Sequence, residues 1–200
     1  MGGFIIMDWK LILRIAVIVT LMFLLASVVI GCKRDTSPII NWDDCSQEVG
    51  DHPCDFTLMD QKGNEFNLYD HHGKIIILDF SAMWCGPCMM AATEVEDLQK
   101  RYGDDIVYVT VLIENQNHKS PTKNDLKKWA DHFGIELAPV LGGNRSMISS
   151  NPKDGWPITA WPSFFIIDQN MVLVESFKGF SRGMIETIIL TNLKDDTGSP

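Results

Sequence analysis

The stretch that decides the fold is DFSAMWCGPCMMAAT, which runs from residue 79 to residue 93. Its centre is a Cys-Gly-Pro-Cys sequence at residues 85–88. Before this centre, residues 74–80 (KIIILDF) are nearly continuous apolar and β-branched, as in a strand buried on both faces. After it, residues 87–102 carry apolar side chains at helical spacing, and Gly103 ends the pattern. The two cysteines are therefore expected at the junction of a buried strand and a helix.

This position suits thiol–disulfide chemistry. Cys85 would lie at the helix N-terminus, where unpaired N–H groups and the positive end of the helix dipole stabilise a thiolate. Pro87 fits the first helical turn, because its missing N–H donor is not needed there. The two intervening residues let Cys88 reach back and close a small disulfide ring. We predict Cys85 as the nucleophile, Cys88 as the resolving thiol, and their disulfide as the redox centre without any other cofactor.

A zinc site is the main metal alternative for a cysteine pair with this spacing. Zinc would need a second pair of ligands at suitable spacing, and the remaining candidates, Cys45 and Cys54, are widely spaced. The histidines show no metal-binding spacing either. We therefore expect solvated histidines and no metal.

The rest of the chain alternates between strand and helix patterns. A β-hairpin is expected around the turn at residues 61–64, because short alternating runs flank it. The other expected elements are strands at 105–113, 163–168 and 171–177, and helices within 87–102, 120–134 and 182–193. Residues 141–157 are expected to form a mobile loop near the active site. The order predicts an α/β fold with a mixed central sheet, flanked by helices on both faces.

Three separate segments carry a resemblance to a known family. WCGPC preceded by LDFSAM (residues 78–88) resembles thioredoxin, and residues 50–74 and 161–168 resemble the N-terminal hairpin and the cis-proline segment of the TlpA/ResA family. This family consists of membrane-anchored, thioredoxin-like thiol–disulfide oxidoreductases. The resemblance covers roughly residues 50–193. It implies a thioredoxin-like fold with an N-terminal β-hairpin extension.

The resemblance also implies roles for residues around the two cysteines. Asp79 stands where thioredoxin has its buried acid, and burial would raise the pKa of this carboxyl so that it could accept the proton of Cys88. The alternative is a strand-end aspartate turned to solvent. Pro162 would be the cis-proline beside which an extended substrate segment pairs. The expected substrate-binding residues are Trp84, Gly86, Pro87, Trp161 and Pro162.

Some positions depart from the family pattern. Trp161 replaces the usual Thr or Val before the cis-proline, and Ala91 stands where ResA-like proteins carry a glutamate. Thr93 takes the place of the proline that kinks the thioredoxin helix. No lysine occurs in residues 107–113, where thioredoxin pairs one with its buried acid. The resemblance therefore does not define the redox potential or the choice of partner at these positions, and the dithiol mechanism stays intact.

The N-terminus has the architecture of an export signal. Basic residues precede an apolar run at residues 15–30, and the following Gly31-Cys32 resembles the end of a bacterial lipobox. We predict a lipoprotein signal peptide at 1–31, lipidation of Cys32, a tether at 32–49, a thioredoxin-like domain at 50–194 and a tail at 195–200. An uncleaved transmembrane helix is the alternative for the apolar run. Both alternatives place the domain outside the cytoplasm, at a membrane.

Cys45 and Cys54 form a second pair in this extracytoplasmic setting, where disulfides persist. A structural disulfide between them is favoured over an electron relay to Cys85, because Cys54 begins the hairpin and does not cap a helix.

The function predicted from these features is reduction of disulfides in exported proteins, with recharging by a membrane electron-transfer partner. Apocytochrome c maturation is implied by the resemblance alone. Alternatives are a disulfide oxidase or isomerase using the same residues, a thiol peroxidase, which would place Thr where Ala82 stands, and a copper chaperone. The formal charge of −9 argues against nucleic acid as a partner.

Overall fold

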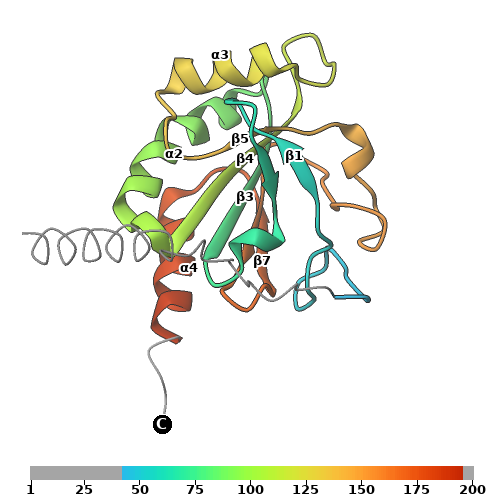
Figure 1. Cartoon of the computed structure of the whole chain (residues 1–200), viewed down its shortest axis with the longest axis vertical. Coiled ribbons are helices and arrows are strands. Elements are labelled where there is room, and N and C mark those ends of the chain that lie inside the picture. The colour runs from blue at the N-terminus through green and yellow to red at the C-terminus, as the bar shows by residue number, and fades with distance from the viewer. Residues whose placement is uncertain (1–41, 196–200) are drawn as a thin grey trace, which may run out of the picture. The chain divides into compact units, whose positions relative to one another are not determined.

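Five strands form the central sheet of the protein (Figure 1). In the computed structural model, which describes residues 42–195, their order is β5-β4-β3-β6-β7. β3 is parallel to β4, and β4 to β5, whereas β6 is antiparallel to both β3 and β7. The strands are β3 (Ile75–Ala82), β4 (Ile106–Glu114), β5 (Val140–Gly142), β6 (Ser163–Ile167) and β7 (Leu173–Lys178). This mixed sheet confirms the predicted α/β, thioredoxin-like class.

The helices and the N-terminal hairpin follow the sequence signals closely. They are α2 (Gly86–Tyr102), α3 (Lys123–Phe133), α4 (Arg182–Asp195), β1 (Thr57–Met59) and β2 (Glu65–Asn67). The hairpin turn is fixed by Asp60, whose carboxylate accepts backbone N–H groups from Lys62 and Asn64, each at 2.8 Å. α3 begins with a capping box between Thr122 and Asp125. These polar contacts act within a few residues of the turn and the helix start that they stabilise.

β3 and β4 form the centre of the sheet, and every residue in both strands is buried. Alternate side chains of each strand enter two separate hydrophobic clusters, one on each face of the sheet. Ile75 and Ile77 of β3 belong to one cluster, and Ile76 and Leu78 to the other. Two buried faces require apolar residues at successive positions, which is the pattern that KIIILDF shows.

The expectation of helices on both faces of the sheet is wrong for the described residues. Apolar side chains of α2, α3 and α4 all join the cluster that contains Ile75 and Ile77. The opposite cluster receives the hairpin, the segment around Trp156 and short 3-10 turns at Tyr69–His71 and Arg145–Met147. The chain moves in one direction from β3 to β4 to β5, and two right-handed crossovers in the same direction place both helices on the same face.

The expected loop at 141–157 is more ordered than its sequence indicated. It begins within β5, which pairs with β4 and which the sequence patterns did not reveal because only three residues take part. The amide of Gln61, at the hairpin turn, bonds the backbone of Ala138 and Val140 on either side of the start of this strand. Trp156, near the other end, is almost fully buried. An edge strand held by a distant side chain leaves no local signal.

Residues 42–49, the described part of the expected tether, pack against the domain. The backbone N–H of Ser46 donates to the carbonyl of His52, and that of Gln47 to Pro152, both at 2.9 Å. Both Ser46 and Gln47 are buried. The structure therefore extends the folded unit at least eight residues before the expected boundary at residue 50.

Two histidines differ from the solvated state that was expected. His52 stacks on Trp42, with ring centroids 4.1 Å apart, and its Nδ1 donates to the Met171 carbonyl. His71 stacks on Phe66, and burial lowers the pKa of its imidazole.

The signal peptide, the lipidation of Cys32 and the first part of the tether lie outside the described residues, as do residues 196–200. These assignments stay predictions. Within residues 42–195, no helix combines the length and apolar character needed to cross a bilayer.

Candidate active site

The Cys85–Cys88 pair sits at the strand–helix junction predicted for it. Cys85 is the N-cap of α2, and its Sγ accepts the backbone N–H of Cys88 at 3.1 Å. A disulfide joins the two residues in this structure. The exposed fraction of Cys85 is 5 %, whereas Cys88 is fully buried. An external sulfur can therefore approach Cys85, and the N–H that bonds its sulfur would favour the thiolate after reduction.

Asp79 is buried and does not turn to solvent. It is 1 % exposed, on the face of β3 that packs against α2. Its carboxyl accepts a hydrogen bond from the Ser81 hydroxyl at 2.6 Å and another from the Tyr108 hydroxyl at 3.4 Å. Burial raises the pKa of Asp79 to about 7, although both hydrogen bonds act in the opposite direction.

The residue beside Asp79 in β4 supplies no positive charge to offset this burial. Thr110 occupies the paired position, and its hydroxyl has no hydrogen-bond partner among residues 42–195. A cation there would favour the charged carboxylate, and threonine cannot do so. The acid at this site is consequently poised to exchange a proton near neutral pH.

Pro162 lies at the same end of the sheet as the cysteines. Ser163 pairs with Phe80, shortly before the dithiol segment leaves β3. The peptide bond between Trp161 and Pro162 is cis, as expected. Pro162 is buried and Trp161 is half-buried. Within and next to the dithiol segment, Trp84, Gly86 and Pro87 are exposed.

Trp84 is held by a group that sequence reasoning missed. Its indole Nε1 donates to Glu114 Oε2 at 2.8 Å. Glu114 also bonds Arg145 and His118, and the His118 ring lies 4.8 Å from the Trp84 ring. The one available signal was an acidic residue directly after a buried apolar strand, in the sequence VYVTVLIE.

A pocket of about 400 Å³ lies beside the dithiol segment on the side of α3. Met83 and Met89, which flank the cysteines in sequence, line it together with Gln116, Lys128, Trp129, His132 and Phe133. No group of three His, Cys, Asp or Glu side chains within residues 42–195 is arranged to hold a metal ion.

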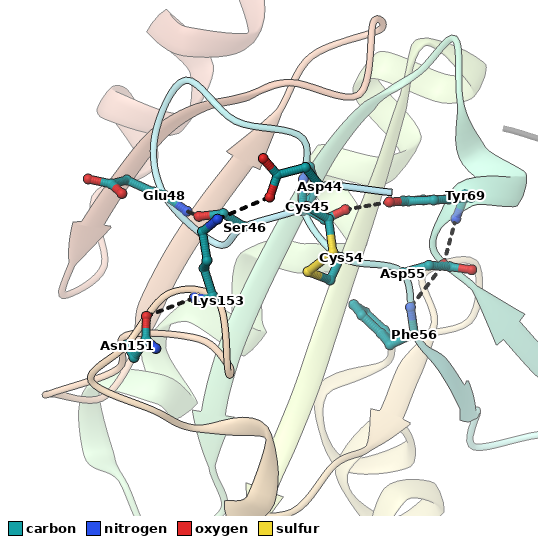
Figure 2. The surroundings of a disulfide bond; sticks show 11 residues. Asp44, Cys45, Ser46, Glu48, Cys54, Asp55, Phe56, Tyr69, Asn151 and Lys153 are labelled. Atoms are coloured by element: carbon teal, nitrogen blue, oxygen red, sulfur yellow. Dashed lines mark hydrogen bonds and ion pairs between the residues drawn. A yellow bond between two sulfur atoms is a disulfide. The ribbon is translucent and has the colours of Figure 1, made fainter. Parts of the chain in front are cut away.

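Cys45 and Cys54 are joined by a second disulfide (Figure 2). Close to it, Lys153 pairs with Asp44 at 3.0 Å, and the Tyr69 hydroxyl donates to the Pro53 carbonyl at 2.7 Å. The neighbouring Phe56 packs on the hydrophobic cluster opposite the helices, whereas Cys85 and Cys88 belong to the helix-covered cluster. The two disulfides are thus associated with opposite faces of the sheet, which favours a structural role for the second.

Removing this second disulfide is expected to weaken the fold without affecting redox turnover. Closing a loop of this length restricts the unfolded chain, so a Cys45→Ser/Cys54→Ser variant should lose about 2–3 kcal/mol of unfolding free energy. Urea unfolding of oxidised protein and a disulfide-reduction assay measure the two quantities. Loss of activity with unchanged unfolding would instead indicate an electron relay.

Comparison with known proteins gives one consistent result. Residues 49–176 match the AhpC/TSA family. The chain is 26 % identical to the thioredoxin-like protein YneN of Bacillus subtilis over 66 % of this chain and 72 % of YneN. It is 30 % identical to the thiol-disulfide oxidoreductase ResA of Geobacillus kaustophilus, over 61 % of this chain and 64 % of ResA. The chain thus spans slightly less than two thirds of that ResA.

Solved structures give the same fold. The exposed lipoprotein thioredoxin Etrx1 of Streptococcus pneumoniae superposes with a TM-score of 0.56 at 27 % identity, over 69 % of this chain and 99 % of that chain. A DsbF homologue from Corynebacterium diphtheriae, at 17 % identity, gives a TM-score of 0.58 over 68 % of this chain and 83 % of its own. With the dithiol geometry described above, these findings show that the chain belongs to the AhpC/TSA family, among thioredoxin-like thiol–disulfide oxidoreductases of the TlpA/ResA type.

Proposed function

We propose that this protein reduces disulfides in exported proteins, outside the cytoplasm and anchored to a membrane through lipidated Cys32. The observation that carries the proposal is the arrangement of Cys85 and Asp79. The less buried cysteine of the pair caps a helix, and a buried carboxyl with a pKa of about 7 lies on the sheet face beneath that helix. This combination supplies a nucleophile and a proton acceptor for two successive thiol–disulfide exchanges.

The reaction begins with the reduced protein. The Cys85 thiolate attacks one sulfur of a client disulfide, which forms a mixed disulfide and releases the other client sulfur as a thiolate. Cys88 then gives its proton to Asp79 and attacks Cys85 Sγ. The second client sulfur leaves as a thiolate, and the Cys85–Cys88 disulfide closes. Two electrons pass to the client, and a membrane electron carrier must return two electrons to the protein.

Cellular location and clients rest on sequence and on relatives. The apolar run before Cys32 resembles a lipoprotein signal, and one structural relative is itself named an exposed lipoprotein thioredoxin. Reduction of apocytochrome c is the client reaction that the ResA resemblance suggests. Trp84, Gly86, Pro87, Trp161 and Pro162 would form the surface that receives the client.

The reduction potential of the Cys85–Cys88 pair tests the direction of electron flow. We expect a value close to that of thioredoxin, about −270 mV, in equilibrium with a dithiothreitol series. A value near about −120 mV, as in DsbA, would identify an oxidant and overturn the proposal. Rapid consumption of hydrogen peroxide by the reduced protein would favour a peroxidase instead.

A further inference from the structure

Three side chains from separate segments converge on one buried carboxylate. Glu114, the last residue of β4, is only 1 % exposed. Trp84 donates to its Oε2 at 2.8 Å, the Nδ1 of His118 lies 3.3 Å from the same oxygen, and Arg145 bonds its Oε1. A buried charge is costly unless it is paired and hydrogen-bonded, and this one is both.

The first of these segments leads directly into the dithiol. Met83 donates its backbone N–H to the Glu114 carbonyl at 2.9 Å, and the Gln116 side chain donates to the Met83 carbonyl at 2.6 Å. Residues 114–116 therefore hold both the backbone of Met83 and the indole of Trp84. Trp84 remains 37 % exposed, so part of its ring faces solvent while its N–H is fixed.

The segment that carries Arg145 leads toward the cis-proline. Arg145 begins a 3-10 turn, and Met147, at the end of that turn, accepts the backbone N–H of Trp156 at 2.8 Å. A Cβ placed on Gly155 would lie 2.7 Å from the Met147 carbonyl oxygen. The two arms of this loop are therefore in direct contact at these residues. The chain then continues to Trp161 and Pro162, on the other side of the dithiol.

We infer that Glu114 is a positioning residue that holds Trp84 and the loop preceding Pro162 in one arrangement for recognition of polypeptide clients. This inference rests on the proposed disulfide-reductase function. Glu114 would not touch the reacting sulfurs. It would fix the relative position of two parts of the client-binding surface, so that the surface is formed before the client arrives.

Charge on Glu114 is central to this role. Burial by itself would raise the pKa of the carboxyl, but the hydrogen bonds from Trp84, Arg145 and His118 outweigh it and lower the pKa. The group is therefore an anion at neutral pH, and hydrogen bonds to an ionised acceptor are stronger than bonds to a neutral one. A neutral amide of the same shape would weaken all three contacts at once.

The test compares a large client with a small one. Reduced Glu114→Gln protein is assayed against insulin, as a polypeptide disulfide, and against hydroxyethyl disulfide, which is too small to span the surface. We expect the KM for insulin to rise about five- to tenfold, as loss of charged hydrogen bonds implies. The rate with hydroxyethyl disulfide should change by less than about twofold. The equilibrium constant that defines the Cys85–Cys88 reduction potential should also change by less than about twofold.

Glu96→Gln is the matched control, because Glu96 is another buried glutamate of this domain. Its carboxylate accepts the backbone N–H groups of Glu136 and Leu137, away from Trp84. This variant should lose stability without changing the ratio between the two substrates. The indole ¹⁵N–H resonance of Trp84, assigned with a Trp84→Phe variant, should shift in Glu114→Gln and not in Glu96→Gln.

The possible outcomes separate clearly. An unchanged KM for insulin, an equal loss with both substrates, or the same selectivity change in Glu96→Gln would each overturn the inference. If Glu114→Gln does not fold, Arg145→Ala removes one contact of a largely exposed side chain, and a selective rise in KM is then expected from that variant. If the unaltered protein reduces neither substrate, the proposed function itself has failed, and the inference fails with it.

Discussion

A Cys88→Ser variant should stop the reaction at the mixed disulfide between Cys85 and the client. Cys85 can still attack, because its position at the N-cap of α2 does not depend on the Cys88 sulfur. The second exchange has lost its nucleophile, so we expect turnover to fall by about 10³-fold or more. A covalent adduct should appear on incubation with a client and disappear on addition of dithiothreitol, which mass spectrometry can follow.

The matched control for this variant is Cys85→Ser. Cys88 is fully buried, whereas Cys85 retains some exposure, so a remaining Cys88 thiol should form little or no adduct with a folded client. Equal trapping by both variants would contradict the assignment of Cys85 as the attacking residue. Such a result would also remove the basis for placing the client surface around Trp84 and Pro87.

Replacing Asp79 with asparagine should stabilise the protein at alkaline pH. The pKa of Asp79 is raised to about 7 in the fold, compared with 3.8 for an unperturbed aspartate. Between these values the folded state holds a proton that the unfolded state has released, so stability falls as pH rises from about 4 to about 7. The variant lacks this penalty, and its gain in unfolding free energy should grow from near zero below pH ~4 to as much as about 4 kcal/mol above pH ~7.

The same substitution should slow the second exchange. Asparagine can still accept the Ser81 hydrogen bond, but it cannot take the proton from Cys88. We expect the release of client from the mixed disulfide to slow by about 10²-fold near pH 7, the lower range for loss of a general base. Denaturant titrations across pH and single-turnover kinetics measure the two effects. A pH-independent stability difference would show that Asp79 does not titrate in this range.

The thiol chemistry could be predicted because its signals are local. The apolar run 74–80, the helical pattern after it and Pro87 all lie within a short stretch, and each constrains its own neighbours. The same run favoured burial of Asp79 over a position turned to solvent, since both faces of such a strand are covered. The hairpin at Asp60 and the capping box at Thr122 are local in the same sense.

Other features depend on contacts between distant residues. The sequence did not indicate that residues 42–49 pack on the domain, because Gln47 bonds Pro152 far along the chain. Nor did it indicate that α2 and α3 share one face, which depends on where β5 joins the sheet. β5 in turn depends on Gln61, whose side chain accepts the Val140 N–H. The two residues are 79 positions apart in the sequence.

The sequence by itself therefore determined the redox pair and its helix cap and favoured burial of the nearby acid, since strand and helix propensities act over a few neighbouring residues. The tertiary structure alone decided what surrounds that pair. Glu114 bonds Trp84 and Arg145, which lie 30 and 31 positions away in the sequence, respectively. A residue's own neighbours do not encode such a meeting, because it exists only after the sheet has brought the ends of its strands and their loops together.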